Sequence, residues 1–470
     1  MNTDVLIVGA GPTGLTLGID LARRGVDALL VERDGTLFPG SRGKGFQPRT
    51  MEVFDDLGVL DAIRAAGGTY PVGMLWKDGH RAGEHRMFEP LPASEETPYT
   101  EPWMVPQWRT QEILRDRLEE LGGRVAFGRE VVGVLQDAYG VTARLASGGT
   151  VHARYAVAAD GGRSAVRRAL GVGMTGETVD PHPMLVADVR IDGLDRDNWH
   201  FFPAEEAGGR LALCPLAGTE DFQLTAELPE GTEVDLTPDG IRKVIADRTH
   251  LAAQDVTEVR WASDFRPRAA LADRFRVGRV FLAGDAAHVH SPAGGQGLNT
   301  SIQDAYNLGW KLGAVLTGRA PATLLDSYEE ERRPIAAQML GVSTGVHRGE
   351  VRRGKATQQL ALGYPESSLT AETRTAPTGT LRAGDRAPDG KVDGVRLFDA
   401  FRGPHWTLLA LGTDVPDVPD EHLGAIRIVR GPEHGAYGRG AFLVRPDGYI
   451  GWAAETSDGL MEYLVRVGLR

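Results

Sequence analysis

The sequence predicts a multidomain protein of mixed α/β and α+β class, and three observations support this prediction. The chain has 470 residues, more than a single hydrophobic core usually organises. It opens with an apolar strand, a glycine-rich turn, a buried helix and a second apolar strand, which is the order of a βαβ unit. Residues from about 173 to 272 carry strand-like runs that indicate a sheet of a different kind.

The βαβ unit occupies the first forty residues. Val5–Val8 is a short continuous apolar run, typical of a parallel strand buried on both faces. Gly9-Ala10-Gly11-Pro12-Thr13-Gly14 follows, and an apolar helix then continues to a stop at Gly25. Ala28–Val31 is the second strand, and Glu32 and Arg33 close it.

Further elements follow from apolar spacing. The spacing of Leu114, Leu118 and Leu121 predicts a helix over Gln111–Leu121. Residues 279–283 return to an apolar strand, and a glycine-rich loop leads into a long helix from about Leu298 to Leu316. The other predicted strands lie within Val125–Leu135, Val141–Leu145, Val151–Ala159, Met184–Ile191, Arg210–Leu216, Phe222–Glu227, Trp406–Leu411, Ile426–Val429 and Ala441–Ile450, the last divided by a turn at Pro446-Asp447-Gly448.

Charge, cysteine content and hydropathy exclude several classes of function. The net charge of −12 argues against a general nucleic-acid binder, which needs a basic surface. The single cysteine, Cys214, excludes an internal disulfide and a multi-cysteine metal site, and it fits a reducing compartment. No signal peptide precedes Val5, and no apolar stretch reaches the roughly 18 residues of a membrane span. We therefore expect a cytoplasmic protein that binds neither nucleic acid nor membrane.

The first glycine motif predicts a dinucleotide site. Gly9 permits the tight turn, Gly11 lets a pyrophosphate approach the backbone, and Gly14 lets helix and strand pack closely. The phosphate then meets free N–H groups and the positive end of the helix dipole. Glu32 stands at the end of the second strand, where a carboxylate can bind both ribose hydroxyls. This motif alone does not distinguish FAD from NAD(P).

Two further motifs carry a family resemblance. They are Asp160-Gly161-Gly162-Arg163-Ser164-Ala165-Val166-Arg167, and Gly284-Asp285-Ala286-Ala287-His288 followed by Ser291–Asn299. With the first motif they resemble the single-component FAD-dependent aromatic hydroxylases of the p-hydroxybenzoate hydroxylase fold. The last ninety residues resemble the thioredoxin-like tail of the phenol and polyketide hydroxylases, which places the chain nearest to actinobacterial polyketide or antibiotic hydroxylases.

The resemblance implies a division into domains. The Rossmann-type FAD-binding domain would comprise residues 1–70, 104–172 and 273–345. An inserted antiparallel sheet domain for the substrate would comprise residues 71–103 and 173–272. A connection over 346–379 would lead to the thioredoxin-like domain, 380–470, which has no cysteine and therefore no dithiol chemistry.

The resemblance also implies cofactor residues. Asp285 would bind the ribityl chain, and the glycines at 294, 295 and 297 would let the backbone lie against the flavin ring. The N–H groups of Leu298 and Asn299 would face the flavin N1–C2=O edge and stabilise its negative charge. Arg42 would lie near the pyrophosphate, with Lys44 as an alternative. The full set for FAD is Gly9, Gly11, Pro12, Thr13, Gly14, Glu32, Arg33, Arg42, Gln107, Asp160, Asp285, Gly295, Gly297, Leu298 and Asn299.

The implied reaction is hydroxylation of an aromatic, phenolic or polyketide-type compound through a C4a-hydroperoxyflavin, with NADPH or NADH and O2 as co-substrates. Arg163 and Arg167 are the NAD(P)H candidates, and the Pro292 backbone carbonyl would face the substrate. Trp103, His200, Phe201 and Arg210 are pocket candidates. A Baeyer–Villiger or epoxidising monooxygenase remains an alternative, as does a flavin-binding partner without turnover.

The histidine pair and the single cysteine could also indicate a metal site or a nucleophile. His288-Val289-His290 lacks a third ligand at a recognised spacing, so we expect no metal and a structural His288. Cys214 lies in an apolar strand and is expected to pack in a core. The tail is expected to act structurally or at a subunit interface, which leaves a homodimer open.

Overall fold

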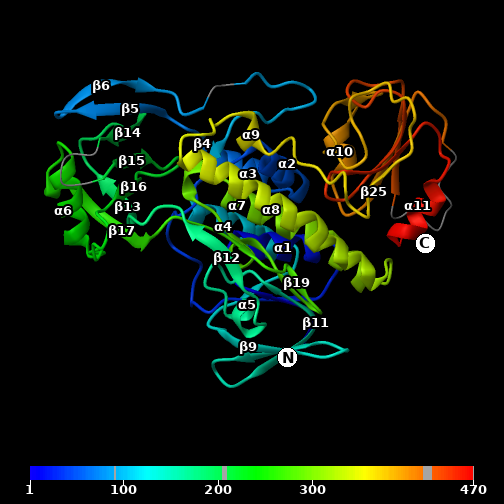
Figure 1. The fold of residues 1–470 in the computed structure, drawn as a ribbon, viewed down its shortest axis with the longest axis horizontal. Helices are drawn as coiled ribbons and strands as arrows, with labels where there is room; N and C mark the ends of the chain where they lie inside the picture. Colours follow the sequence, from blue (N-terminus) through cyan, green and yellow to red (C-terminus); the bar gives the residue numbers. More distant parts are fainter. Residues whose placement is uncertain (89–90, 204–208, 416–425, 469–470) are drawn as a thin grey trace.

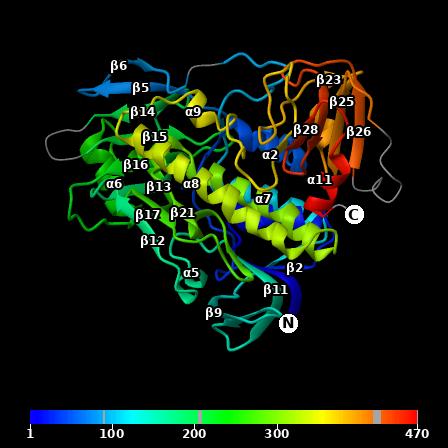
Figure 2. The ribbon, with the colours of Figure 1, turned by 45° about the vertical axis from the view of Figure 1, so that its right-hand side comes forward.

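The computed structural model describes residues 1–88, 91–203, 209–415 and 426–468. They build three large sheets. A seven-stranded sheet and a five-stranded C-terminal sheet lie on opposite sides of a central body that contains α1, α7 and α8 (Figures 1 and 2). Within these described ranges, no helix combines the length and apolarity needed to cross a membrane.

The central body is built on the first sheet. Its strand order is β19-β20-β11-β1-β2-β8, parallel from β20 to β8, and β9 and β10 extend β11 as an antiparallel ribbon. Helix α1 (Pro12–Ala22) packs between α4 (Gln107–Glu120) and α7 (Gly297–Leu316). The strands are β1 (Asn2–Val8), β2 (Ala28–Val31), β8 (Val125–Ala126), β9 (Val131–Gln136), β10 (Val141–Leu145), β11 (Thr150–Ala158), β19 (Arg276–Val277) and β20 (Val280–Leu282).

The seven-stranded sheet has the order β17-β13-β16-β15-β14-β5-β6 and is antiparallel except where β14 meets β5. One face packs on an apolar core that includes residues of α6 (Pro238–Arg248), and η1 (Ala253–Asp255) contacts that helix. The strands are β5 (Val72–Lys77), β6 (His80–His85), β13 (Met184–Ile191), β14 (Asn198–Phe202), β15 (Leu211–Pro215), β16 (Phe222–Glu227) and β17 (Val256–Phe265).

Smaller elements connect these sheets. Two three-stranded sheets run β3-β7-β4 and β12-β18-β21. Their strands are β3 (Gly45–Phe46), β4 (Gly68–Thr69), β7 (Trp103–Met104), β12 (Met174–Thr178), β18 (Arg268–Ala272) and β21 (His288–Val289). The remaining helical elements before the tail are α2 (Pro48–Leu57), α3 (Leu60–Ala65), α5 (Ala165–Ala169), η2 (Gly284–Ala286), η3 (Pro292–Gly294), η4 (Ala322–Leu325), α8 (Asp326–His347) and α9 (Lys355–Gln358).

The C-terminal sheet has the order β22-β28-β27-β25-β26. Its strands are β22 (Ala371–Glu372), β25 (Trp406–Leu411), β26 (Ile426–Gly431), β27 (Gly440–Val444) and β28 (Ile450–Ala454), with α10 (Leu397–Phe401), α11 (Leu460–Val467) and the hairpin of β23 (Lys391–Val392) and β24 (Val395–Arg396) around it. Strand β22 lies inside the segment for which the sequence predicted only an irregular connection, and it pairs with β28. A two-residue strand carries too little periodicity to be found from sequence.

Candidate active site

The three glycines of the first turn differ in the space that surrounds them. Gly9 has φ of 106°, and a Cβ there would lie 2.4 Å from the Ala159 carbonyl oxygen. A Cβ on Gly14 would lie 2.0 Å from the Gly9 carbonyl oxygen. A Cβ on Gly11 would meet nothing within 4 Å. Gly9 and Gly14 are therefore required by packing, whereas Gly11 borders open space at the uncapped N-terminus of α1.

The three sequence motifs meet around this turn. Thr13 lies against Gly284, where an added Cβ would stand 2.6 Å from the Thr13 hydroxyl oxygen. Asp160 accepts hydrogen bonds from the N–H groups of Ala165 and Val166 through one carboxyl oxygen, and its other oxygen is buried without a partner. Pro12 occupies the first turn of α1.

Arg167 joins the second and third motifs. Its guanidinium donates to the carbonyls of Ala286 at 2.9 Å and Gly162 at 3.0 Å. The residue is buried, so its interactions hold the two loops together. Arg163 is exposed, and it interacts electrostatically with Arg42. Of the two candidates for NAD(P)H, only Arg163 keeps an exposed side chain.

Asp285 carries a carboxylate that the described protein leaves without a hydrogen bond or ion pair. Its side chain is open to solvent, yet the surrounding protein desolvates it and raises its pKa, against the opposing effect of His288 and Arg42. A carboxylate enclosed by protein but still reachable from solvent is suited to accept hydrogen bonds from a ligand's hydroxyl groups.

Arg42, which interacts with Asp285, lies next to a cluster of three residues, namely Gly43, Gln107 and Leu298. The Gln107 side-chain oxygen accepts from the Gly43 N–H at 2.9 Å. A Cβ on Gly43 would lie 2.9 Å from Leu298 Cδ2. Arg42 donates to the Ser263 hydroxyl of β17 at 2.7 Å, which links this loop to the seven-stranded sheet. Lys44, the alternative to Arg42, turns toward that sheet instead.

The N-terminus of α7 has no side-chain cap. Gly295 has φ of 61° and is exposed, and Gly297 packs near His290. Asn299 is buried, and its side chain accepts from the Gln47 N–H while donating to the carbonyls of Gly45 and Gly295. Its side chain thus fixes the loop, and the N–H groups of the first turn stay available for a negative charge.

Pro292 is exposed in η3, and its carbonyl accepts from the Gly295 N–H at 3.1 Å. Glu32 accepts from the N–H of Ala10 at 2.8 Å, so this carboxylate stands beside the glycine turn as expected. Arg33 is exposed and lies 3.6 Å from Asp34.

A buried hydrogen-bond network behind the Gly284–His288 segment was not predicted from the sequence. Asp304 of α7 accepts from His288 at 2.6 Å, from Arg332 of α8 at 2.8 Å and from the Gly284 N–H at 3.0 Å. Although burial works to raise it, His288 and Arg332 hold the pKa of Asp304 below its usual value. His288 is therefore a structural anchor of the loop. Asp304 stands in an apolar helix without a motif, and only its burial reveals its role.

The substrate candidates require corrections. His200 is fully buried on the face that packs against the apolar core, where it accepts from Trp76 and contacts the Asp195 carbonyl, so it cannot line a pocket. Arg210 points to solvent, with its side chain 78% exposed, and lies 3.6 Å from Glu227. Trp103 lies in the small sheet of β3, β7 and β4 and donates to the Ile63 carbonyl.

Phe201 faces the opposite side of β14 from His200. Its ring stands 5.0 Å from that of Trp199, whose ring is 5.9 Å from Tyr70. Phe88 lies 5.1 Å from Tyr70. Arg353, after α8, stands over Phe88 and donates to the Ala293 carbonyl beside Pro292, which joins this aromatic group to the α7 loop.

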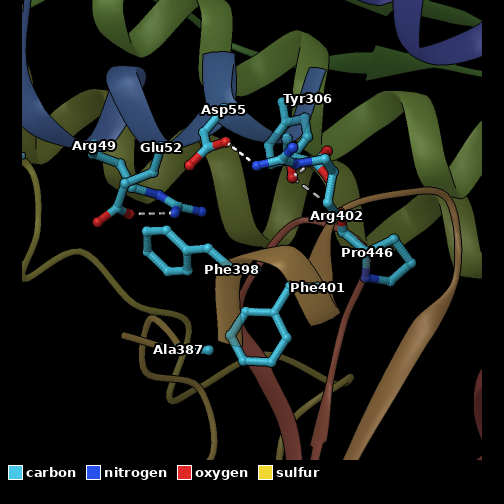
Figure 3. Close-up of a pocket in the computed structure, with 11 residues that line it drawn as sticks. Arg49, Glu52, Asp55, Tyr306, Ala387, Phe398, Phe401, Arg402 and Pro446 are labelled. Carbon is cyan, nitrogen blue, oxygen red and sulfur yellow. Dashed lines mark hydrogen bonds and ion pairs between the residues drawn. The ribbon is translucent and has the colours of Figure 1, made fainter. Parts of the chain in front are cut away.

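A separate small pocket lies between α2 and the C-terminal domain. Figure 3 shows Phe398 and Phe401 facing Glu52 and Asp55 across it, with Asp55 directed at Arg402. Its volume is about 30 Å³, room for a water or two but not for an aromatic ring. The pocket is a gap in an interdomain contact.

Asp180, His182 and Glu227 are the one described group that brings metal-ligand atoms within 4.8 Å of one another. His182 is hydrogen-bonded to Asp180 at 2.7 Å, and Glu227 lies 3.6 Å from Arg210. Because these groups already have partners, we assign no metal to them.

Comparison with known proteins agrees with this geometry. Residues 2–343 match the family described as "FAD binding domain", and residues 380–467 match "Aromatic-ring hydroxylase, C-terminal". A flavin-dependent monooxygenase of Mycobacteroides abscessus is 47% identical over 476 residues, 98% of this chain and 99% of that one. A 12-dehydrotetracycline 5-monooxygenase/anhydrotetracycline 6-monooxygenase of Streptomyces rimosus is 35% identical over 99% of this chain and 98% of its own. The structure of aklavinone-11 hydroxylase with FAD and aklavinone superposes with a TM-score of 0.83 at 30% identity, covering 100% of this chain and 99% of that one.

Proposed function

The chain belongs to the FAD-binding-domain family of flavin-dependent monooxygenases, and from that premise we propose that it hydroxylates a polycyclic phenolic compound, using NAD(P)H and O2. The substrates named for its relatives, anhydrotetracycline and aklavinone, support this substrate class.

The observation that carries the proposal is how well the described residues suit FAD. Open space at Gly11 suits a pyrophosphate, and the unbonded Asp285 carboxylate suits ribityl hydroxyls. Glu32 suits the adenosine ribose, and the uncapped start of α7 suits the electron-rich edge of the ring. FAD bound there would supply hydride acceptance from a nicotinamide and the activation of oxygen.

The protein's own part is binding, orientation and charge. The free N–H groups at Gly297, Leu298 and Asn299 would stabilise negative charge on a bound ring through the helix dipole. Asn299 holds the Gly295 loop in place for this task. The aromatic group of Tyr70, Phe88 and Trp199 would orient a flat substrate and exclude water from it.

We place NAD(P)H on the surface near Arg163, because the chain carries one glycine fingerprint and Arg163 is exposed beside Arg42. Arg163→Ala should then weaken NAD(P)H dependence more than FAD retention. The division of the chain into domains, its cytoplasmic location and a homodimer remain proposals of the same kind.

The test is a screen of polycyclic phenols for stimulated NAD(P)H consumption, followed by mass spectrometry of products formed under ¹⁸O₂. A gain of one labelled oxygen on an aromatic ring is expected. Ring expansion or an epoxide would favour the alternative monooxygenase reactions, and oxidation of no compound by FAD-loaded protein would favour a binding partner without turnover.

A further inference from the structure

A row of side chains crosses the seven-stranded sheet on the face away from its apolar core. Asp188 of β13 is paired with Trp261 of β17 on one side and Gln223 of β16 on the other, and Gln223 is paired with Cys214 of β15. Directly paired residues project from the same face of a sheet. The neighbours of Asp188 along its strand, including Val189, belong to the core behind.

The segment Gly40–Gly45 lies on this row. A Cβ on Gly40 would touch the Trp261 ring. The Ser41 carbonyl accepts from the Gln223 amide, and Lys44 donates to the Gln223 oxygen. The same segment carries Arg42 and Gly43 to the candidate FAD site. Ser41 and Lys44, which contact the row, are therefore the immediate sequence neighbours of Arg42 and Gly43, which border the candidate FAD site.

Several polar atoms in the row have no partner. Asp188 is 2% exposed, and its carboxyl oxygens make no hydrogen bond of ideal geometry; Ser41, through its hydroxyl and N–H, and Lys44 are the groups near enough to favour its charged form. The Trp199 indole nitrogen is buried and unbonded. Lys44 and Asp188 form no ion pair within 4.0 Å in the described structure. Burial outweighs the effects of Ser41 and Lys44, and a buried carboxylate so weakly satisfied is costly, so a functional reason is expected.

Aromatic rings border these unbonded atoms. The Lys44 ammonium stands 4.5 Å from the centre of the Trp199 ring, the first member of the Trp199, Tyr70 and Phe88 group. The chemistry of these groups, flat rings beside an acceptor carboxylate and two donors, suits a fused ring system with oxygens along its edge.

We propose that Asp188, Lys44 and Trp199 form the subsite that recognises the oxygenated edge of the substrate. This rests on the proposed function and names residues for it. Asp188 accepts a hydrogen bond from a ring hydroxyl, and Lys44 and the indole N–H of Trp199 donate to the neighbouring ring oxygen. The ligand class is a polycyclic aromatic with a hydroxyl beside a carbonyl, because Asp188 offers an acceptor while Lys44 and Trp199 offer donors along the same face of the sheet.

Burial raises the pKa of Asp188 to about 6 and lowers the pKa of Lys44. Both directions follow from the loss of water around these groups, a deficit that Ser41 and Gln223 offset only in part. A hydroxyl that donates to Asp188 and an oxygen that accepts from Lys44 would remove this deficit.

The experiment compares two soluble probes that share rings and charge. Quinizarin-2-sulfonate carries hydroxyls beside both carbonyls, and anthraquinone-2-sulfonate carries none. Equilibrium dialysis against FAD-loaded protein measures both affinities without turnover. The wild type should bind quinizarin-2-sulfonate at least roughly tenfold more tightly, the worth of one charge-assisted hydrogen bond.

Asp188→Asn should reduce this preference to within about threefold while leaving affinity for anthraquinone-2-sulfonate nearly unchanged, whereas Lys44→Met should weaken both probes because both carry the carbonyl oxygen. Glu258→Gln, an exposed carboxylate on β17, is the matched control and should keep the full preference. Equal affinity of the wild type for both probes overturns the inference even if neither variant folds, and so does failure to bind the hydroxylated probe. Neither result affects the hydroxylase proposal, which stands or falls on oxygen incorporation.

Discussion

Arg445 of the C-terminal domain donates two hydrogen bonds, of 2.7 and 2.9 Å, to the carboxylate of Glu331 in α8. Lys311 of α7 donates to the same carboxylate, and Asp447 accepts from Arg445. All four side chains are buried. Although burial works to raise it, Arg445 and Lys311 hold the pKa of Glu331 far below its usual value. The last domain therefore completes an ion network that begins in the central body.

Arg445→Met should lower the free energy of unfolding by about 3–5 kcal/mol, because it leaves the buried carboxylates without their strongest partner. Urea unfolding followed by fluorescence measures the loss. Arg466→Met, on the outer side of α11, removes an exposed arginine and should change stability little. Equal stability of the two variants would mean that the network does not hold the domains together.

Deleting residues from 380 onward should impair solubility or assembly, because it uncovers α2 and removes Arg445. The candidate FAD residues all precede residue 300, so the truncated chain should still bind FAD. Gel filtration and flavin absorbance test the two statements separately. A well-folded truncated protein that binds no FAD would show that our division into domains is wrong.

Gly11→Ala and Gly14→Ala separate ligand space from packing space. At Gly11 the added methyl meets no protein atom, so the apoprotein should keep its stability while FAD affinity falls roughly tenfold or more. At Gly14 the methyl collides with the Gly9 carbonyl and should cost about 1–3 kcal/mol of stability as well. Thermal unfolding of both apoproteins and FAD titration give the comparison. Undiminished FAD binding by Gly11→Ala would place the pyrophosphate elsewhere.

Asp285→Ala should weaken FAD binding about ten- to a hundredfold, the loss of a charge-assisted hydrogen bond of roughly 1.5–3 kcal/mol. Titration of refilled apoprotein by flavin fluorescence measures it. Asp264→Ala is a matched control, since Asp264 also interacts with Arg42 but lies on β17. If both variants lose affinity equally, the effect comes from Arg42 and not from a ribityl contact.

Asp188→Asn should stabilise the protein at pH 8 by up to about 3 kcal/mol, and this advantage should shrink as the pH falls from about 6 toward 3.8. The pKa of Asp188 is raised to about 6 in the folded protein from 3.8, so the folded state binds its proton more tightly than the unfolded state. The wild type therefore gains stability from this group as the pH falls from about 6 to 3.8, and the variant's advantage is lost over the same range. Thermal unfolding across this range tests it, with Glu258→Gln expected to show no comparable change. A constant difference would mean that Asp188 is not the titrating group.

Local patterns predicted the strands well. Strand-like runs located β2, β13, β16 and β25 within the bounds observed. The glycine motifs located the turns that the structure brings together at the candidate FAD site, because each motif marks a turn in one short segment. What sequence could not show was which side of a strand each residue faces. His200 and Phe201 are adjacent, yet one enters the core and the other the candidate substrate side.

The sequence also could not show which charged residues, far apart along the chain, form ion pairs. Asp304, Glu331 and Lys311 lie in helices without a motif, and their charges are explained only by residues far along the chain. In the sequence, Asp188 is one of two charged residues in an otherwise apolar strand. Only the register that sets it beside Gln223 and under Ser41 distinguishes it from a surface carboxylate.

In the seven-stranded sheet, folding and recognition are assigned to alternate residues of the same strands. Val189 supports the core, while Asp188 supports the row on the other face. A mutation in the row therefore leaves the core contacts intact, and selection can act on the two properties almost independently. Such an enzyme can evolve new specificity readily, because substitutions at a few cross-strand positions can change which ring system it accepts while the fold stays the same.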